Sequence, residues 1–297
     1  MTPLVSFIVI SHARSRMLVS AITSIHRQSA VNREIVVVVN GHDCETMVNL
    51  PPLSDSDPTL RYIVLSENCG VGGGRNVGIQ AAHGEILVFL DDDAEFAAPD
   101  ITFRAMQHFD RHPGLGVVGF SVLEGRSSEV ERRCIPFCNK RLPVGVAAAC
   151  YFAGGACAIR RKVFDAVGPY DASLFYGGEE LDLSYRAIEA GFQILFDPAL
   201  TIRHHAAGGV GLDGLYYCAR NRPWVALRYL PLPMFLTHCL AWWGWSLIRG
   251  CRKRAMPTVL RGIRDSIVHL PAIWAQRRPL SPLALAYLEH NSGRRWY

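Results

Sequence analysis

The sequence has few of the features that mark a secreted or membrane-spanning protein. No basic leader precedes its first apolar run, which begins at Leu4 and is too short and too rich in β-branched residues for a signal peptide. The nine cysteines are an odd number and form no zinc-type C-x-x-C pairs, which favours reduced thiols. A weak metal or redox pair at Cys134 and Cys138 stays open. We therefore expect a cytoplasmic protein.

Acidic residues are scarce in one part of the chain. Residues 219–297 carry thirteen Lys and Arg but two acids, whereas residues 1–218 carry eighteen basic and twenty-four acidic residues. The net charge of +5 hides this asymmetry, and the two parts are expected to have different partners. No nucleic-acid-binding motif accompanies the basic part, and its aromatic and aliphatic content favours lipid over nucleic acid.

Four unbroken apolar runs have the length and β-branched content of buried strands: 5–11, 34–40, 61–65 and 86–90. Helical patterns separate them, and a shorter strand is expected at 116–120. Unbroken apolar strands that alternate with helices are typical of a parallel sheet covered on both faces. The sequence therefore predicts an α/β fold.

The strand at 86–90 ends in three adjacent acids, Asp91, Asp92 and Asp93. Alternate side chains of an extended chain point the same way, so Asp91 and Asp93 can converge on one cation while Asp92 points elsewhere. Two carboxylates suit Mg²⁺ or Mn²⁺. The alternative is a solvated turn in which an Asp caps the next helix. Ligands bind at the carboxyl ends of strands in open α/β sheets, which favours the cation site.

A glycine-rich segment follows the third strand, at 66–78. The dinucleotide-binding fingerprint fails because Arg75 stands where it needs a glycine, and no Gly-Lys-Ser/Thr of a P-loop follows. Arg75 and Asn76 at the start of a helix are placed to meet an anion. A glycine-rich surface turn remains the alternative.

A second group of acids stands at the first turn of a helix expected from about 179 to 190. The helix dipole and an Asp182–Arg186 pair explain two of the three acids, Glu179, Glu180 and Asp182. We consider Glu180 as a general base that takes a proton from a hydroxyl. Downstream, one of the adjacent histidines His204 and His205 is a candidate metal ligand.

With both groups of acids in view, the sequence resembles family 2 glycosyltransferases of the GT-A fold. The matching segments, in order over residues 4 to about 205, are F-I-V-I-S-H-A-R, V-V-V-V-N-G, N-C-G-V-G-G-G-R-N-V-G, F-L-D-D-D-A-E, A-G-G-A-C-A-I-R-R and G-G-E-E-L-D-L-S-Y-R-A-I-E-A-G-F. The resemblance implies a Rossmann-like, mostly parallel sheet flanked by helices.

The resemblance also implies a nucleotide-diphosphate sugar donor, a Mn²⁺ or Mg²⁺ ion held by a D-x-D motif, and roles for individual residues. The catalytic candidates are Glu180, Asp93, Glu179 and Asp182. The donor or nucleotide candidates are His12, Arg14, Asn40, Asn68, Gly70, Arg75, Asp91, Asp92, Gly154 and Gly155. The metal-ligand candidates are Asp91, Asp93 and His204.

These parts fit one displacement that inverts the anomeric configuration. The cation would neutralise charge on the departing diphosphate while Glu180 deprotonates the acceptor hydroxyl. The chain departs from the family pattern at two places: Val39 stands in place of an Asp, and His12 stands at the end of the first strand. The choice between UDP and dTDP as the nucleotide therefore stays open. The glutamine and tryptophan motif of processive synthases is absent after residue 186, so we expect addition of one sugar or a few.

The character of the chain changes near residue 216. We divide it into a catalytic domain, 1–215, and a basic, aromatic-rich helical region, 216–297. The segment 229–248 is apolar but contains Pro231, Pro233 and His238. It either lies in the membrane interface, spans the membrane, or forms a helical cap or homodimer interface.

The predicted function is therefore a glycosyltransferase at the inner face of the cell membrane. The expected acceptor is a glycan or lipid-linked precursor in cell-envelope or polysaccharide biosynthesis. The alternatives are a non-catalytic, membrane-anchored nucleotide-binding subunit of the same fold and a sugar nucleotidyltransferase.

Overall fold

The fold is built on one mixed sheet. The computed structural model describes residues 4–12, 14–29, 32–41, 57–125, 127, 129–205 and 211–291. Within these residues, nine strands pair in the order β3-β2-β1-β4-β8-β6-β9-β5, with β7 paired to β9. The strands are β1 (Leu4–Ser11), β2 (Asn32–Val39), β3 (Leu60–Val64), β4 (Ile86–Asp91), β5 (Ala94–Phe96), β6 (Leu115–Glu124), β7 (Ala147–Ala148), β8 (Ala156–Arg160) and β9 (Gln193–His204).

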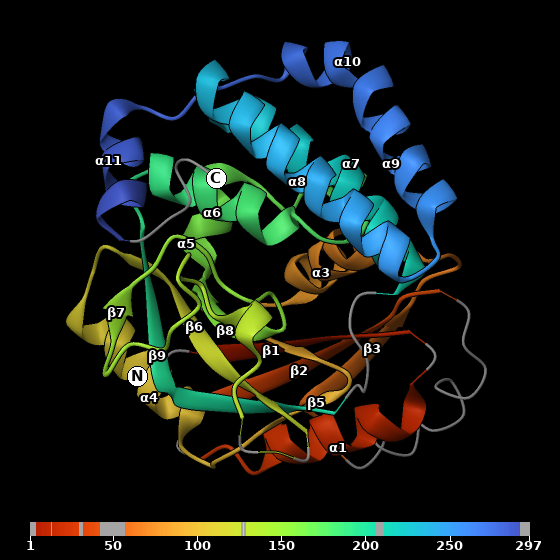
Figure 1. Cartoon of the computed structure of the whole chain (residues 1–297). Helices are drawn as coiled ribbons and strands as arrows, with labels where there is room; N and C mark the ends of the chain where they lie inside the picture. Colours follow the sequence, from red (N-terminus) through yellow and green to blue (C-terminus); the bar gives the residue numbers. More distant parts are fainter. Residues whose placement is uncertain are drawn as a thin grey trace.

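The helices lie on both faces of this sheet (Figure 1). They are α1 (Ser15–His26), α3 (Gly70–Ala81), α4 (Ile101–Arg111), α5 (Arg161–Val167), α6 (Glu179–Glu189), α7 (Leu212–Tyr229), α8 (Leu232–Arg252), α9 (Met256–Val268), α10 (Leu270–Ala275) and α11 (Pro282–His290). The four predicted strands in the first ninety residues are confirmed as β1 to β4, all parallel to one another.

Alternate side chains of the central strands fill two separate cores. Phe7 and Val88 point toward α1 and α4, whereas Ile8 and Phe89 point toward the layer that contains α5 and α6. This period of two along unbroken apolar strands is what a sheet buried on both faces requires. The α/β fold predicted from the sequence is therefore confirmed.

The glycine-rich segment differs from both expectations, because residues 70–81 form a helix, α3, and not a ligand loop or a surface turn. Its glycines allow the helix to approach the sheet closely. A Cβ on Gly78 would lie 2.5 Å from Ile8 Cγ2, and one on Gly74 would lie 3.0 Å from Ile10 Cγ2. Glycine disfavours helices in isolation, so tertiary packing decides the conformation here.

The C-terminal helices pack onto the N-terminal part of the chain. Trp224 and Val225 of α7 and Leu288 of α11 belong to the same core as Phe89 of β4. Figure 1 shows α8, α9 and α10 as an outer layer above α3 and α6. Among the described residues, no helix has both the length and the apolar content needed to cross a membrane, and the 229–248 segment divides between α7 and α8.

One buried acid at the edge of the sheet makes stability dependent on pH. Glu34 of β2 accepts hydrogen bonds from Ser6 and from the His83 N–H, and pairs with Arg61 at 2.7 Å. Burial alone would raise the pKa of Glu34, but these partners lower it to about 2. A lowered native pKa stabilises the fold above the unfolded pKa of about 4.3, and this stabilisation disappears as the pH falls toward 2.

We therefore expect Glu34→Gln to lower the free energy of unfolding at pH 7 by about 1–2 kcal/mol. The difference from the wild type should shrink steadily between about pH 4.5 and 2. Urea unfolding at several pH values measures both effects. Glu85→Gln, at an exposed glutamate beside the same edge, is the control and should change little. An equal loss at pH 7 and pH 2.5 would contradict this assignment.

Candidate active site

The candidate site lies at the carboxyl end of β4, in the middle of the sheet. Asp91 is the last residue of β4, and β5 begins at Ala94, so Asp92 and Asp93 form the connection. Strand β1 flanks β4 on one side in parallel, and β8 flanks it on the other side in the opposite direction. The pairing in the sheet therefore changes from parallel to antiparallel at β4. The segment before β8 lies across the end of β4.

The three acids of the D-x-D segment face different partners. Asp92 is buried and accepts hydrogen bonds from the His12 N–H and from Arg14. Burial and the neighbouring Asp93 raise the pKa of Asp92 to about 6. Asp92 thus ties β4 to the segment after β1, and it shares Arg14 with Asp93, whereas the sequence pattern had paired Asp93 with Asp91.

Asp93 is buried between Arg14 and His204. Its carboxylate forms an ion pair with Arg14 and lies 3.4 Å from His204 Nε2. The other ring nitrogen of His204, Nδ1, lies 2.7 Å from Oε1 of Glu131. Asp93 and Glu131 together raise the pKa of His204 to about 10, so the imidazolium balances part of the local negative charge.

Arg75 joins the two groups of acids, which are almost ninety positions apart in the sequence. Its buried guanidinium lies 3.5 Å from Asp91, 3.5 Å from Glu179 and 3.2 Å from Glu180. The sequence placed Arg75 at the nucleotide, but the structure places it between the end of β4 and the start of α6. Three carboxylates around one guanidinium leave an excess of negative charge.

Gly154 and Gly155 face this cluster directly. A Cβ on Gly154 would lie 2.2 Å from Arg75 Nη1 and 2.4 Å from Glu180 Oε1, and one on Gly155 would lie 2.1 Å from Asp91 Cγ. Real Cβ atoms do not approach other atoms so closely, so any side chain here would displace the acids. Both glycines therefore lie against the acids of the cluster, and the contact with a transferred sugar stays a prediction.

Glu179 and Glu180 differ in their surroundings. The Glu179 side chain is almost fully buried, whereas 13% of the Glu180 side chain is exposed. Burial and the adjacent Glu180 carboxylate raise the pKa of Glu179. A buried acid of raised pKa is a poor carrier of negative charge at neutral pH, so Glu180 is the better placed of the two to act as a base.

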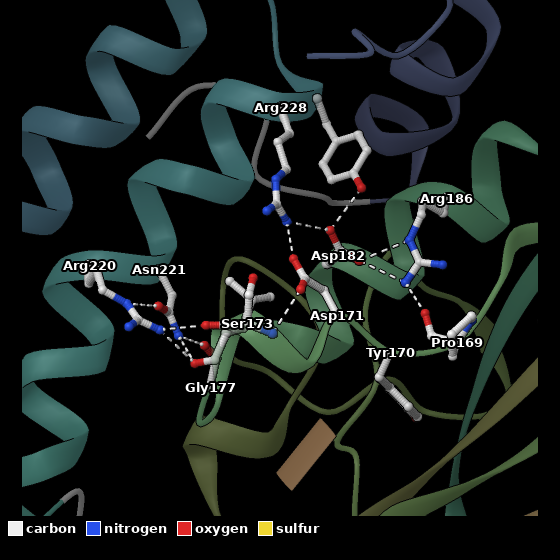
Figure 2. A network of polar contacts seen from close by, with 12 residues as sticks. Pro169, Tyr170, Asp171, Ser173, Gly177, Asp182, Arg186, Arg220, Asn221 and Arg228 are labelled. Carbon is white, nitrogen blue, oxygen red and sulfur yellow. Dashed lines mark hydrogen bonds and ion pairs between the residues drawn. The ribbon is translucent and has the colours of Figure 1, made fainter. Parts of the chain in front are cut away.

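Asp182 does not join the cluster, although the sequence grouped it with the catalytic candidates. Its carboxylate lies 2.7 Å from Arg186 and accepts a hydrogen bond of 2.8 Å from the Tyr229 hydroxyl. It also faces Arg228 of α7 (Figure 2). Because the carboxylate is buried among these partners, the structure gives Asp182 the role of an anchor between α6 and α7.

The donor-side candidates near α3 have structural partners of their own. The Asn40 side chain accepts a hydrogen bond from the Cys69 N–H and donates one to the Gly70 carbonyl. The Asn68 side chain accepts from the Gly70 N–H, and Gly70 has a φ of 79° and contacts Phe175. Asn40 is buried with these partners, which gives it a structural role between β2 and α3. Asn68 is exposed and Arg14 is half-exposed, so both are accessible.

The predicted metal ligands are not assembled as one set. Within the described part of the chain, no three His, Cys, Asp or Glu side chains are arranged to hold a metal ion. Asp93 and His204 are close together, whereas Asp91 faces Arg75, because the two arginines pair with the acids. The chemistry of the site still fits a divalent cation. Asp93 Oδ1 is buried and accepts no hydrogen bond from a described residue, and carboxylate and imidazole ligands suit Mn²⁺.

Three residues that contribute to the site were not found from the sequence. Glu131 pairs with His204, Arg228 pairs with Asp182, and Asn221 contacts the segment before α6. None stands in a recognisable motif. The only sequence feature that singled out Arg228 was the basic charge of the C-terminal part. That charge predicted an external partner and not an ion pair with Asp182.

Comparisons with known proteins agree with this arrangement. The family model described as glycosyl transferase family 2 matches residues 6–168. The chain is 37% identical over 110 residues to the succinoglycan biosynthesis protein ExoO of Rhizobium meliloti, covering 36% of this chain and 30% of that protein. It is 35% identical over 95 residues to a GalNAc(5)-diNAcBac-PP-undecaprenol beta-1,3-glucosyltransferase of Campylobacter jejuni, covering 31% and 30%. The chain therefore spans less than a third of the length of these two relatives.

Solved structures share the fold over nearly the whole chain. The mannosyltransferase PcManGT of Pyrobaculum calidifontis, in complex with GDP-Man and Mn²⁺, matches with a TM-score of 0.62 at 17% identity, covering 99% of this chain and 87% of that one. TarS of S. aureus in complex with UDP-GlcNAc matches with a TM-score of 0.65 at 17% identity, covering 98% and 89%. Since the family model covers more than half of the 297 residues, the chain belongs to glycosyl transferase family 2 and has the GT-A fold.

Proposed function

We propose that this protein transfers a sugar from a nucleotide-diphosphate donor to a hydroxyl of a glycan or lipid-linked acceptor, with inversion at the anomeric carbon. The observation that carries the proposal is the meeting of Asp91 and Glu180 around Arg75 and the Gly154–Gly155 pair. A metal-side acid and a base-side acid thus lie on the two sides of the Arg75 guanidinium, against two glycines that have no side chains. Such an arrangement suits in-line displacement, in which acceptor and leaving group occupy opposite faces of the sugar.

The roles of the residues follow from their positions. Glu180 is the base that takes the proton from the acceptor hydroxyl, and Arg75 stays charged because the surrounding acids raise its pKa against the effect of burial. Asp91, Asp93 and His204 would hold a Mn²⁺ or Mg²⁺ ion once Arg75 moves away from Asp91 and the His204 imidazolium loses its proton, and the bound ion would neutralise charge on the departing diphosphate. Arg14, half-exposed beside Asp93, is placed to contact a phosphate.

The donor class is tested by measuring nucleotide release. The protein with Mn²⁺ is mixed with UDP-, dTDP- and GDP-sugars, and free nucleotide diphosphate is measured with and without an undecaprenyl-linked acceptor. We expect turnover with UDP- or dTDP-sugars that chelation of the metal abolishes. Nucleotide binding without any turnover would favour a non-catalytic subunit. Pyrophosphate release from a nucleoside triphosphate would favour a sugar nucleotidyltransferase.

We also propose that α8 rests on the inner face of the cell membrane. Leu236, Leu240 and Ile248 follow one face of this helix at intervals of four and eight, and each is about half or more exposed. Arg249 stacks on Trp245, 4.8 Å from its ring centroid, and a basic cluster at 252–254 follows. An apolar face beside arginines and tryptophans suits an interfacial helix on anionic lipid, and the lipid-linked acceptor would be reached there.

Vesicle sedimentation tests the membrane proposal. We expect binding to vesicles with phosphatidylglycerol, weaker binding to phosphatidylcholine alone, and a loss of about tenfold or more for Leu240→Asp because a charge replaces an apolar contact. Leu142→Asp, at an exposed leucine outside the C-terminal helices, is the control. Absent vesicle binding together with a homodimer that Leu240→Asp dissociates would assign the face to a subunit interface instead.

A further inference from the structure

The segment that leads into α6 has an unusual backbone. Phe175 has a φ of 60°, and Gly177 and Gly178 have φ values of 74° and 105°. Helix α6 begins directly afterwards at Glu179, and its N-cap residue, Gly178, offers no side chain as a cap. A non-glycine residue in the left-handed region costs energy and persists only where its surroundings impose it. The position of Glu180 therefore depends on what holds this segment.

One side of the segment is held by α3. The Phe175 carbonyl accepts a hydrogen bond of 2.7 Å from the Val71 N–H. Gly70 packs against the same carbonyl, and a Cβ there would lie 2.4 Å from it. This contact fixes one edge of the segment, and within the segment the Tyr176 N–H donates a hydrogen bond of 2.6 Å to the Leu174 carbonyl.

The other side is held by Asn221 of α7, which is fully buried. Its Nδ2 atom lies 2.7 Å from the Leu174 carbonyl oxygen, 3.0 Å from that of Tyr176 and 2.7 Å from that of Gly177. The adjacent Arg220 donates to the Ser173 and Leu174 carbonyls and to Asn221 Oδ1 (Figure 2). Buried carbonyls are costly to leave without a donor, so this amide strongly restrains the segment.

A second set of contacts fixes the helix itself to α7. Arg228 pairs with Asp171, and it also reaches Asp182 at 3.4 Å. Together with Tyr229, these residues connect the end of α7 to the first turn of α6 (Figure 2). Helix α7 lies outside residues 6–168, the part matched by the family model, but it contacts α6 from the start of the segment to the first turn of the helix.

We infer that Asn221 is a positioning residue for Glu180, through the 174–178 segment. This inference rests on the proposed function. Asn221 itself touches none of the acids of the cluster in the contacts described above. Its amide fixes the left-handed turn, the turn fixes where α6 begins, and the start of α6 directs Glu180 toward Gly154. The C-terminal helices thereby take part in catalysis in addition to any contact with a membrane.

The test compares Asn221→Asp, which keeps the shape but replaces the donor with an acceptor, with Trp224→Phe as a matched control. Trp224 also lies buried on α7 and donates one hydrogen bond, to the Ser266 carbonyl of α9. We expect Asn221→Asp to lower kcat by about 10–100-fold and to leave the affinity for the nucleotide and Mn²⁺ within about twofold, because Asp91 ends β4 and Asp93 lies in the connection to β5, away from α6. Trp224→Phe should lower the melting temperature with kcat within about twofold.

A double-mutant cycle separates positioning from a general loss of structure. In a Glu180→Gln background, Asn221→Asp should cause little further loss of kcat, since both changes act on the same base. Fully additive losses, or an unchanged kcat in a folded Asn221→Asp protein, would overturn the inference. If Asn221→Asp fails to fold, Arg220→Met removes the Nη2 donor to the Ser173 and Leu174 carbonyls and should lower kcat several-fold. A wild-type protein without turnover would instead refute the proposed function.

Discussion

Replacing Glu180 with glutamine is expected to lower kcat by about 10²–10⁴-fold while nucleotide affinity stays within about twofold. General base catalysis contributes a factor of this size, and glutamine keeps the shape of the side chain without its ability to accept a proton. Glu180 lies beside Arg75 and Gly154 at the start of α6. Single-turnover rates with a UDP- or dTDP-sugar, together with calorimetric titration of the nucleotide, measure both quantities.

Glu179→Gln is the comparison for this experiment. Burial raises the pKa of Glu179 and so favours its protonated, neutral form. Glutamine resembles this neutral form. We expect a loss of at most about tenfold. The opposite result, with Glu180→Gln active and Glu179→Gln inactive, would exchange the roles of the two glutamates. Full activity in both variants would exclude either as the base.

Replacing Asp93 with asparagine is expected to weaken Mn²⁺-dependent nucleotide binding by on the order of 100-fold or more. Changes to residues that only support a metal ligand cost 10–100-fold in affinity, so loss of a ligand should cost at least as much. Asp93 Oδ1 is buried with His204 Nε2 at 3.4 Å, and a bound cation would take the place of the imidazolium as its positive partner. Titration of UDP with and without Mn²⁺ measures the effect, and chelation of the metal from the wild type should reproduce it.

Asp100→Asn is the control for charge. It removes one acid from an exposed position before α4, where the nearest basic partner is Arg104 at 4.0 Å. Its nucleotide affinity should equal that of the wild type. Asp93→Asn also removes an ion pair with Arg14, so its melting temperature is measured separately from its affinity. Undiminished Mn²⁺-dependent binding in a folded Asp93→Asn protein would remove Asp93 from the metal site.

The two substitutions act on different steps, which makes them informative together. A loss of turnover with intact binding in one, and a loss of binding in the other, would separate the base from the metal site. The same loss in both would indicate one electrostatic unit, since Arg75 contacts both Glu180 and Asp91, which stands two positions before Asp93.

Much of this protein could be predicted from local sequence patterns. Strands such as 86–90 are unbroken apolar runs because both faces of the sheet are covered. This pattern can be recognised in the sequence without knowledge of the tertiary structure. The acids at 91–93 and 179–182 were recognisable because charges at the end of a buried strand or at a helix start have few structural explanations. The order of these segments was sufficient to indicate the family that the comparisons confirmed.

Other features depend on contacts between residues far apart in the chain. The glycines of α3 predict a loop in isolation, and only close packing against Ile8 and Ile10 makes them helical. Asp182 and Glu180 stand two positions apart in one motif, yet one faces Arg228 and Tyr229 while the other faces Arg75. The composition and order of the chain thus determined the sheet, the family and the acids of the site. Tertiary structure alone decided which acid anchors and which can react, because burial and ion partners set the charge and freedom of each carboxylate.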